Sequence, residues 1–354
     1  MRKNIAVLDL GSNRIALAVA SIGYDGSISI NALENTLSRG IKCGEIVDIN
    51  KVIADIQAIR DKIQKEKGVK RLRKIFAVTK GIDVKTEPSS GMIPLARSPR
   101  EITKRDIEKC LDMTTMMRLP LERSIVGKTI KGFYVDGGKQ GINNPIGLYG
   151  IKLEAEAFVT TAPTSKIHNL TKCIDHAGLL LEGTHLSGEA VAVSVLDEAE
   201  KEKGVLLLDI GDSLTEAIIF KNRLLKEFWM IENGAGTILD ENKHIIPKKL
   251  NILLENIAST VKQTNEEFTS VVVTGGGALL DGIIEKVEAA LNCPTKIGIA
   301  KIKGVNLSLQ NAIIHAGTIG LIKQLASDYK KAHSHKNPFR KFSRKLLDIY
   351  ESYF

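Results

Sequence analysis

The sequence predicts an α/β fold of two related domains, with a smaller α+β insert and an amphipathic segment at residues 338–354. The main observation is an internal repeat, VLDLGSNRIALAV (residues 7–19) and LLDIGDSLTEAII (207–219). Each copy reads as a buried strand ending in Asp, a glycine turn and a second apolar strand. The second observation is a change of texture, because six of the nine prolines fall between residues 88 and 163. A duplicated strand–turn–strand unit interrupted by a proline-rich stretch indicates two similar domains and an insert.

The first domain is predicted from apolar runs and one helical stripe. Residues 5–10, 15–22, 28–33 and 74–79 have the composition of buried strands. Residues 50–67 carry isoleucines and a valine at helical spacing, which predicts an amphipathic helix. The order is therefore β-β-β-α-β.

The insert and the second domain follow the same reasoning. Within the insert, Thr103 and Asp106 form a capping-box-like helix start, and residues 125–135 and 148–161 are expected strands. A helix is expected over 165–177. The second domain is expected to have strands at 204–209, 217–220 and 271–274, and helices at 278–291 and 311–325. The predicted boundaries are 1–81 with 165–197 for the first domain, 82–164 for the insert, 198–325 for the second domain with a short subdomain at about 235–264, 326–337 for a linker, and 338–354 for an amphipathic helix.

Composition excludes several classes of protein. With 43% hydrophobic and 26% charged residues, the chain has the composition of a globular protein and not of a wholly disordered one. The four cysteines stand apart without clustered histidines, which argues against a zinc site or a disulfide scaffold and favours a cytosolic setting. Aromatic residues make up 5% and are not interleaved with basic ones in the body of the chain, so a nucleic-acid partner is not expected.

The net charge of +9 is concentrated near residue 354. Residues 336–354 contain five basic and two acidic residues. At about 100° per residue, apolar and basic side chains there fall on opposite sides of a helix. This pattern predicts an interfacial helix on an anionic membrane surface, although docking on the protein's own body or on a partner helix is the alternative. The expected membrane residues are Phe339, Arg340, Phe342, Arg344, Lys345, Leu346, Ile349, Tyr350, Tyr353 and Phe354.

The repeated turns are the candidate site. A strand that ends in Asp and enters a glycine turn offers backbone N–H groups to a phosphate and a carboxylate to hydrated Mg²⁺. Two such turns facing each other would clamp a triphosphate, and a third glycine turn after residues 271–274 would approach a base or ribose closely. The candidate cofactor residues are Asp9, Gly11, Ser12, Asn13, Arg14, Asp209, Gly211, Asp212, Ser213, Gly275, Gly276 and Gly277, with Asp9 and Asp209 as the metal ligands.

The order of these three turns resembles the actin-like ATPase superfamily, and within it the FtsA family of bacterial cell-division proteins. SRGIKCGEIVDINKV (38–52) is similar to a loop and helix start of that family, and GINNPIGLYGIKLEAEAFVTTAP (141–163) to its distinctive inserted subdomain. The resemblance implies duplicated ribonuclease-H-like domains, ATP with Mg²⁺, and at most slow hydrolysis, with no catalytic residue assigned. It also implies a filament on the cytoplasmic side of the membrane at the division site, tethering FtsZ and recruiting other division proteins.

Two departures from the family bear on nucleotide binding. Asp212, Ser213 and Leu214 follow Gly211 where the family has glycines, which places a carboxylate opposite a phosphate. The stretch from 235 to 256 is far shorter than the family's subdomain. The alternatives are an enzyme of the exopolyphosphatase type, which DLGSN also resembles, a pilus-assembly relative, and a scaffold that binds no nucleotide.

Overall fold

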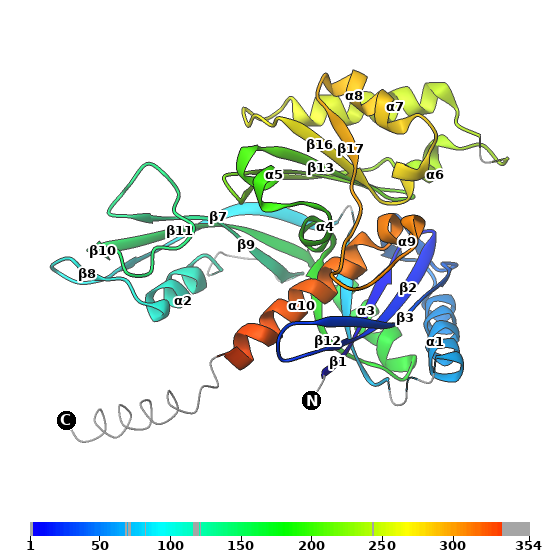
Figure 1. Ribbon diagram of the computed structural model, residues 1–354, viewed down its shortest axis with the longest axis horizontal. Coiled ribbons are helices and arrows are strands. Elements are labelled where there is room, and N and C mark those ends of the chain that lie inside the picture. Colours follow the sequence, from blue (N-terminus) through cyan, green and yellow to red (C-terminus); the bar gives the residue numbers. More distant parts are fainter. Residues whose placement is uncertain are drawn as a thin grey trace.

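The computed structural model describes residues 3–67, 69, 72–81, 83–115, 120, 122–242 and 244–334. Two five-stranded sheets form two domains, one above the other in Figure 1, and a smaller unit projects to the left. The lower sheet belongs to the first domain and the upper sheet to the second. The projecting unit is the insert, which leaves the first domain after β6 and returns to it at α3.

The first domain is built on a mixed sheet with the order β12-β6-β1-β2-β3. Strands β1, β2 and β3 form an antiparallel meander, and β6 and β12 add to β1 in parallel. The strand bounds are β1 (Lys3–Leu10), β2 (Arg14–Ile22), β3 (Ile28–Leu37), β6 (Lys74–Thr79) and β12 (Leu180–Leu186). A small pair, β4 (Ile41–Lys42) and β5 (Glu45–Ile46), follows β3.

The second domain repeats this topology strand for strand, with the order β15-β14-β13-β16-β17. Its first three strands form the antiparallel meander, and its last two add in parallel beside β13. The bounds are β13 (Val205–Ile210), β14 (Thr215–Lys221), β15 (Leu224–Ile231), β16 (Ser270–Thr274) and β17 (Thr295–Ile297). The repeated sequence therefore builds two sheets with the same strand order.

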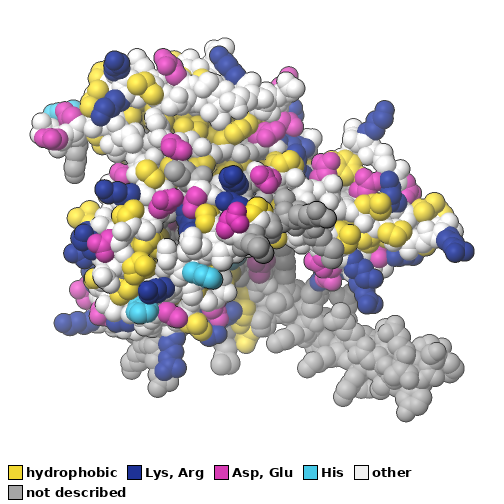
Figure 2. All heavy atoms as spheres, turned by 180° about the vertical axis from the view of Figure 1, so that it is seen from behind, with side chains coloured by type: hydrophobic (Ala, Val, Ile, Leu, Met, Phe, Trp, Pro, Cys, Tyr) yellow, Lys and Arg dark blue, Asp and Glu magenta, His cyan; other side chains and the backbone are white. Residues whose placement is uncertain are grey.

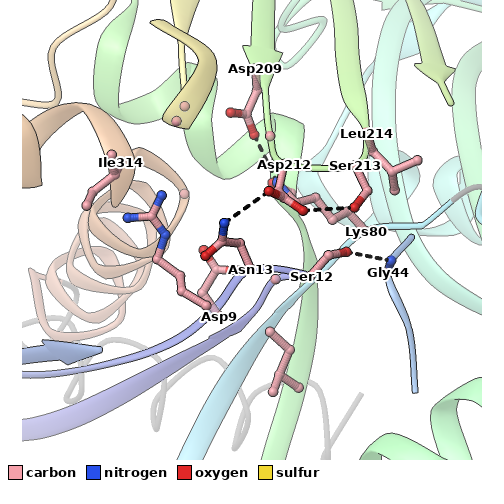
Figure 3. Close-up of a pocket in the computed structure, with 18 of the residues that line it drawn as sticks. Asp9, Ser12, Asn13, Gly44, Lys80, Asp209, Asp212, Ser213, Leu214 and Ile314 are labelled. Atoms are coloured by element: carbon pink, nitrogen blue, oxygen red, sulfur yellow. Dashed lines mark hydrogen bonds and ion pairs between the residues drawn. The ribbon is translucent and has the colours of Figure 1, made fainter. Parts of the chain in front are cut away.

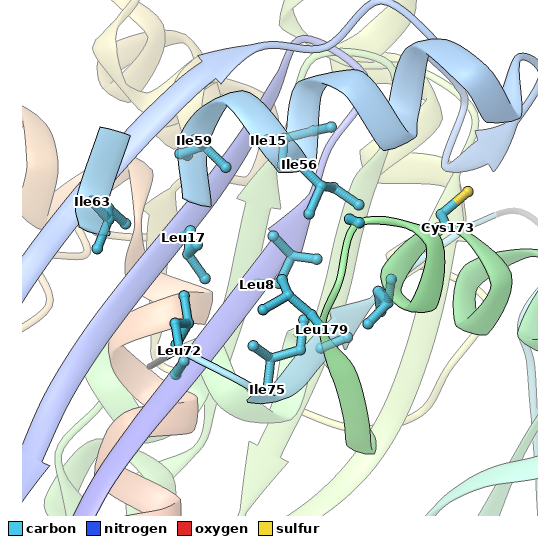
Figure 4. Packing of buried hydrophobic residues seen from close by; sticks show 14 of the residues in the cluster. Leu8, Ile15, Leu17, Ile56, Ile59, Ile63, Leu72, Ile75, Cys173 and Leu179 are labelled. Atoms are coloured by element: carbon cyan, nitrogen blue, oxygen red, sulfur yellow. The ribbon is translucent and has the colours of Figure 1, made fainter. Parts of the chain in front are cut away.

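The core of the first domain lies between its sheet and helices α1 (Ile49–Glu66) and α3 (Thr164–His176). Helix α1 begins at Asp48, whose carboxylate accepts a hydrogen bond from the Lys51 backbone N–H. Its isoleucine stripe points onto the sheet, where Ile56 and Ile59 pack with Leu8 and Leu17 (Figure 4). The helical spacing seen in the sequence is thus the buried face of α1.

The insert is a three-stranded antiparallel sheet, β7-β11-β9, covered by one helix. Its elements are β7 (Lys85–Pro94), β8 (Arg100–Glu101), α2 (Lys104–Met113), β9 (Arg123–Val135), β10 (Tyr149–Gly150) and β11 (Lys152–Pro163). Thr103 and Asp106 form the predicted capping box at the start of α2. Strand β7 was not predicted, because its alternating exposed residues and two prolines obscure the strand pattern.

Two helices lie between the domains and cross each other. Helix α4 (Ser187–Val195) follows β12 of the first domain, yet its Val191 and Ala192 pack in a cluster with strands of the second. Helix α10 (Ala316–Ser334) follows the second domain and lies along the first (Figure 1). Its Leu321 and Ile322 pack on β1 and β2 of the first domain. Each domain therefore supplies a helix to the other, which ties the two together.

The remaining helices correct three sequence predictions. The expected helix 278–291 is a 3₁₀ turn, η1 (Gly276–Leu279), followed by α8 (Ile283–Leu291), because Gly282 in a left-handed conformation interrupts it. The expected helix 311–325 breaks at His315 into α9 (Leu309–Ile314) and α10. Since α10 continues to Ser334, the predicted linker is helical over 326–334, and residues 335–337 lie outside the described part. The other helices are α5 (Glu198–Lys203), α6 (Ala235–Ile238) and α7 (Pro247–Val261).

Candidate functional site

The candidate site is a small cavity between the two domains where the three glycine turns meet (Figure 3). All of the predicted cofactor residues except Gly277 line it. Strands β1 and β13 each direct an Asp and a turn to the cavity, and β16 contributes Gly275 and Gly276. Residues far apart in sequence are brought together because the two sheets present equivalent strand ends to one another.

The first turn is held by its own backbone and by a neighbouring loop. The Gly11 N–H donates to the Arg14 carbonyl at 2.9 Å, which closes the turn between β1 and β2. The Ser12 hydroxyl oxygen accepts from the Gly44 backbone N–H at 3.3 Å. The Gly11 N–H and the Ser12 hydroxyl are therefore partnered within the protein.

The second turn has the same closure and contacts the first across the cleft. The Gly211 N–H donates to the Leu214 carbonyl at 2.9 Å. Asp212, the residue that departs from the glycine-rich pattern, accepts from the Asn13 side-chain amide at 3.0 Å and from the Ser213 hydroxyl at 3.1 Å. This carboxylate thus links the turn of the second domain to the turn of the first.

The third turn requires glycine for two separate reasons. Gly275 has φ of 80°, and a Cβ there would lie 2.3 Å from Asp209 Oδ1. A Cβ on Gly276 would lie 3.3 Å from an Arg14 guanidinium nitrogen, so Arg14 reaches from the first domain to this turn. Gly277 faces the other way and packs on Ile210, which is why it does not line the cavity.

Lys80 is the site residue that sequence reasoning missed. It follows β6, whose carboxyl end lies beside that of β1, and its Nζ lies 3.3 Å from Asp209 Oδ2 of the second domain. Its side chain is 19% exposed and that of Asp209 is 8% exposed. A lysine directly after the apolar strand KIFAVT was the available signal, since strand ends gather at one edge of the sheet.

The electrostatics of the cavity are dominated by burial. Burial raises the pKa of the Asp9 carboxyl, against the opposing effect of Lys80. It also raises the pKa of Glu216, which lies on β14 beneath the second turn. Burial alone would lower the pKa of Lys80, but the carboxylates of Asp209, Glu216 and Asp9 outweigh it and raise that pKa. Lys80 is therefore a fixed positive charge among carboxylates.

The residues present do not fit the predicted Mg²⁺ site. Mg²⁺ requires near-octahedral oxygen ligands at about 2.1 Å. Asp209 is instead paired with the Lys80 ammonium group. The cavity volume is about 70 Å³, which is well below the several hundred Å³ of most small-molecule sites.

One buried histidine is not part of the cavity lining, and the predicted membrane residues fall outside the described part of the chain. His315, buried at the break between α9 and α10, has its pKa lowered to about 4 by burial and by nearby Arg14. The membrane residues, from Phe339 to Phe354, lie outside the described residues. Among the described residues, no helix is long and apolar enough to cross a membrane.

Comparison with known proteins identifies a match in the insert and relatives over most of the chain. A family profile described as "SHS2 domain inserted in FTSA" matches residues 81–161. The cell division protein FtsA of Pseudomonas aeruginosa is 24% identical, with 90% of this chain and 88% of the relative covered. FtsA of Borreliella burgdorferi is 25% identical over 84% and 85%, and FtsA of Streptococcus pneumoniae is 28% identical over 68% and 52%.

Solved structures support the same architecture. The chain is similar to a structure titled PilM-PilN type IV pilus biogenesis complex, with a TM-score of 0.66, 13% identity and 90% and 98% coverage. It is also similar to the ethanolamine utilization protein EutJ from Carboxydothermus hydrogenoformans, with a TM-score of 0.52, 14% identity and 91% and 89% coverage. At these identities the likeness concerns the fold, which is the actin-like ATPase fold.

Proposed function

Since the chain belongs to the FtsA family of actin-like cell-division proteins, we propose that it is a scaffold of the division machinery on the membrane. In this proposal it lies on the cytoplasmic side at the division site, assembles into filaments, tethers FtsZ and recruits other division proteins. Its partners would be FtsZ, further copies of itself, an anionic membrane surface and those proteins, with no nucleic acid.

The observation that carries the proposal is the insert in its structural context. The matched SHS2 segment forms a separate sheet, β7-β11-β9, that stands out from the two actin-like domains (Figure 1). A unit that projects from the body presents both of its sides to other molecules. This geometry favours a protein that is part of an assembly over one that works as a closed monomeric enzyme.

The surface of the insert supports contact with other proteins. Figure 2 views the molecule from behind, where the insert projects to the right and carries hydrophobic side chains. Ile146, Leu148, Tyr149 and Ile151 are all exposed near its tip, Tyr149 by 67%. Exposed apolar side chains gathered in one region are typical of interaction sites. We therefore assign filament or partner contacts to this tip.

Membrane attachment is proposed from the sequence of residues 338–354. Each basic residue near an anionic leaflet contributes about 1 kcal/mol, and a fully buried large apolar side chain contributes about 1.5–3 kcal/mol. Ordering the helix offsets much of this gain, so a single copy should bind modestly. A filament would bind tightly because it presents many copies to one surface.

ATP binding is proposed only for an open form of the cleft. The cavity between the domains is small, and Asn13 and Lys80 of the first domain each contact an Asp of the second. A nucleotide would have to separate these contacts. Hydrolysis is expected to be slow at most, because the nucleotide would serve to change the conformation of a filament.

The test is co-sedimentation with vesicles that contain about one third anionic lipid, together with fluorescent FtsZ and with and without ATP. The protein is expected to pellet with the vesicles, to bring FtsZ with it, and to form filaments visible by electron microscopy of the pellet. FtsZ that stays in the supernatant while the protein pellets would reject the tethering role.

The membrane segment has a matched pair of variants. Leu346→Glu places a charge on the predicted apolar face, whereas Ser352→Glu places the same charge on the predicted polar face. L346E is expected to release most of the protein from vesicles, and S352E to release much less. Equal pelleting of wild type, L346E and a chain lacking 338–354 would show that this segment is not the anchor.

A further inference from the structure

We infer that the Lys80 ammonium group takes the place of a divalent cation in the cleft, and that its ion pair with Asp209 closes the two domains without nucleotide. This inference rests on the geometry of the cleft and goes beyond the proposed division role. In this inference, the positive charge of the cleft is the side chain of Lys80 and not a bound metal ion.

The first step is that the buried carboxyl groups of the cleft require a positive charge beside them. Asp209 Oδ2 lies 3.3 Å from Lys80 Nζ, and the carboxyl groups of Asp9 and Glu216 are near enough to affect the pKa of Lys80. Asp209 and Glu216 are nearly inaccessible to solvent, and Asp9 is partly buried. Buried carboxylates require a compensating positive charge, which a metal ion or a basic side chain supplies. Here a basic side chain of the same protein supplies it (Figure 3).

The second step is the exclusion of a metal. A divalent cation bound to the Asp209 carboxylate would lie about 2.1 Å from its oxygen. Since Lys80 Nζ is 3.3 Å from Oδ2 of that carboxylate, an ion on that oxygen would lie at most about 5.4 Å from a fixed positive charge. The two positive charges repel each other and compete for the same carboxylate.

The third step is that the ion pair spans the domains. Lys80 follows β6 of the first domain, and Asp209 is near the end of β13 of the second. A second contact between the two domains, from the Asn13 amide to Asp212, joins the turn after β1 to the turn after β13 at 3.0 Å. Because both contacts join residues of different domains that line the cavity, opening the cleft requires breaking them. Lys80 thus favours the closed form.

The test compares Lys80→Met with Lys74→Met as the matched control. Lys74 lies on the same strand, β6, and its ion pair with Glu182 of β12 stays within one domain, at 2.6 Å. Both variants remove one lysine and one ion pair. Hydrogen exchange of the residue 209–214 and 275–277 amides reports closure, and Mn²⁺ titration followed by electron paramagnetic resonance reports metal binding, both without nucleotide.

The expected results separate the two variants. K80M is expected to exchange these amides about tenfold faster than wild type and to bind Mn²⁺ about tenfold more tightly, whereas K74M matches wild type. Lys80→Arg, which keeps the positive charge, is expected to bind Mn²⁺ as poorly as wild type. It is the control that separates loss of the charge from misfolding caused by any substitution at this position. Wild type that binds Mn²⁺ as tightly as K80M, or equal exchange in wild type and K80M, would overturn the inference. Neither readout depends on FtsZ or vesicles, so its failure is distinguishable from failure of the proposed function.

Discussion

Replacing Gly320 with alanine should force apart the two helices that join the domains. Gly320 lies on α10 where it crosses α4, and a Cβ there would lie 1.6 Å from the Ala190 carbonyl oxygen. Real side chains do not approach backbone oxygen closer than about 3 Å, so the helices would have to separate by about 1.5 Å. Gly317, three residues earlier on α10, has no atom closer than 3.6 Å to its ideal Cβ position.

The expected change in the free energy of unfolding follows from two opposing effects. Alanine is the better helix former by about 1 kcal/mol, which favours both substitutions. Forcing extra atoms into a packed core costs about 1–3 kcal/mol or more, and a gap of 0.5–1 Å already loses about a quarter to a half of a contact's attraction. G320A is therefore expected to destabilise by about 2 kcal/mol, and G317A to stabilise by up to about 1 kcal/mol.

Urea unfolding measures this difference, with far-UV circular dichroism for both domains and Trp229 fluorescence for the second domain. The two variants are expected to differ by about 3 kcal/mol, which is more than a hundredfold in the unfolding equilibrium. G320A and G317A of equal stability would refute the close crossing of α4 and α10. A G320A protein that unfolds in two separate steps would agree with it, because the contact joins the domains.

Two further predictions concern pH. The pKa of His315 is about 4 in the folded protein and about 6.5 in the unfolded chain. Because the unfolded imidazole takes up a proton while the buried one stays neutral, the protein should lose about 3 kcal/mol of stability as pH falls from 6.5 to 4. His315→Leu should lose less stability than wild type between pH 7.5 and 4.5 in urea unfolding, and parallel pH profiles would contradict this. Asp106 has its pKa lowered, chiefly by hydrogen bonds from Arg100, so its contribution is present above about pH 4 and lost below it. Asp106→Asn should therefore destabilise by about 1–2 kcal/mol at pH 7 and by progressively less below pH 4, and an unchanged difference at pH 3 would exclude this role.

The elements that sequence reasoning found are those with strong local signals. Residues 205–210 are all buried and apolar except for Asp209, so their strand was evident, and Asp48 and Thr103 mark helix starts through their own side chains. Strands β7, β12, β15 and β17 were missed because they are short or half exposed and take their place only by pairing with neighbours. The break at His315 was missed because the apolar spacing continues through it.

The residues of the candidate site likewise fall into those that a local sequence pattern predicts and those that it does not. The repeated turns identified Asp9, Gly211 and Gly275 because a glycine after a strand-end residue is a local pattern. Lys80 also follows a strand and precedes Gly81, but nothing in the sequence pairs it with Asp209, which is 129 residues away. The departure at Asp212 was visible in sequence, but its hydrogen bond to Asn13 was not.

The sequence by itself determined the duplicated α/β plan, the insert and the glycine turns, because each depends on the spacing of residues close in the chain. Only the tertiary structure decided that α4 and α10 each pack on the other domain's sheet, and that Lys80 of the first domain lies beside Asp209 of the second. The reason is physical: packing and charge compensation depend on distances in space, which the fold sets between residues that the sequence keeps far apart.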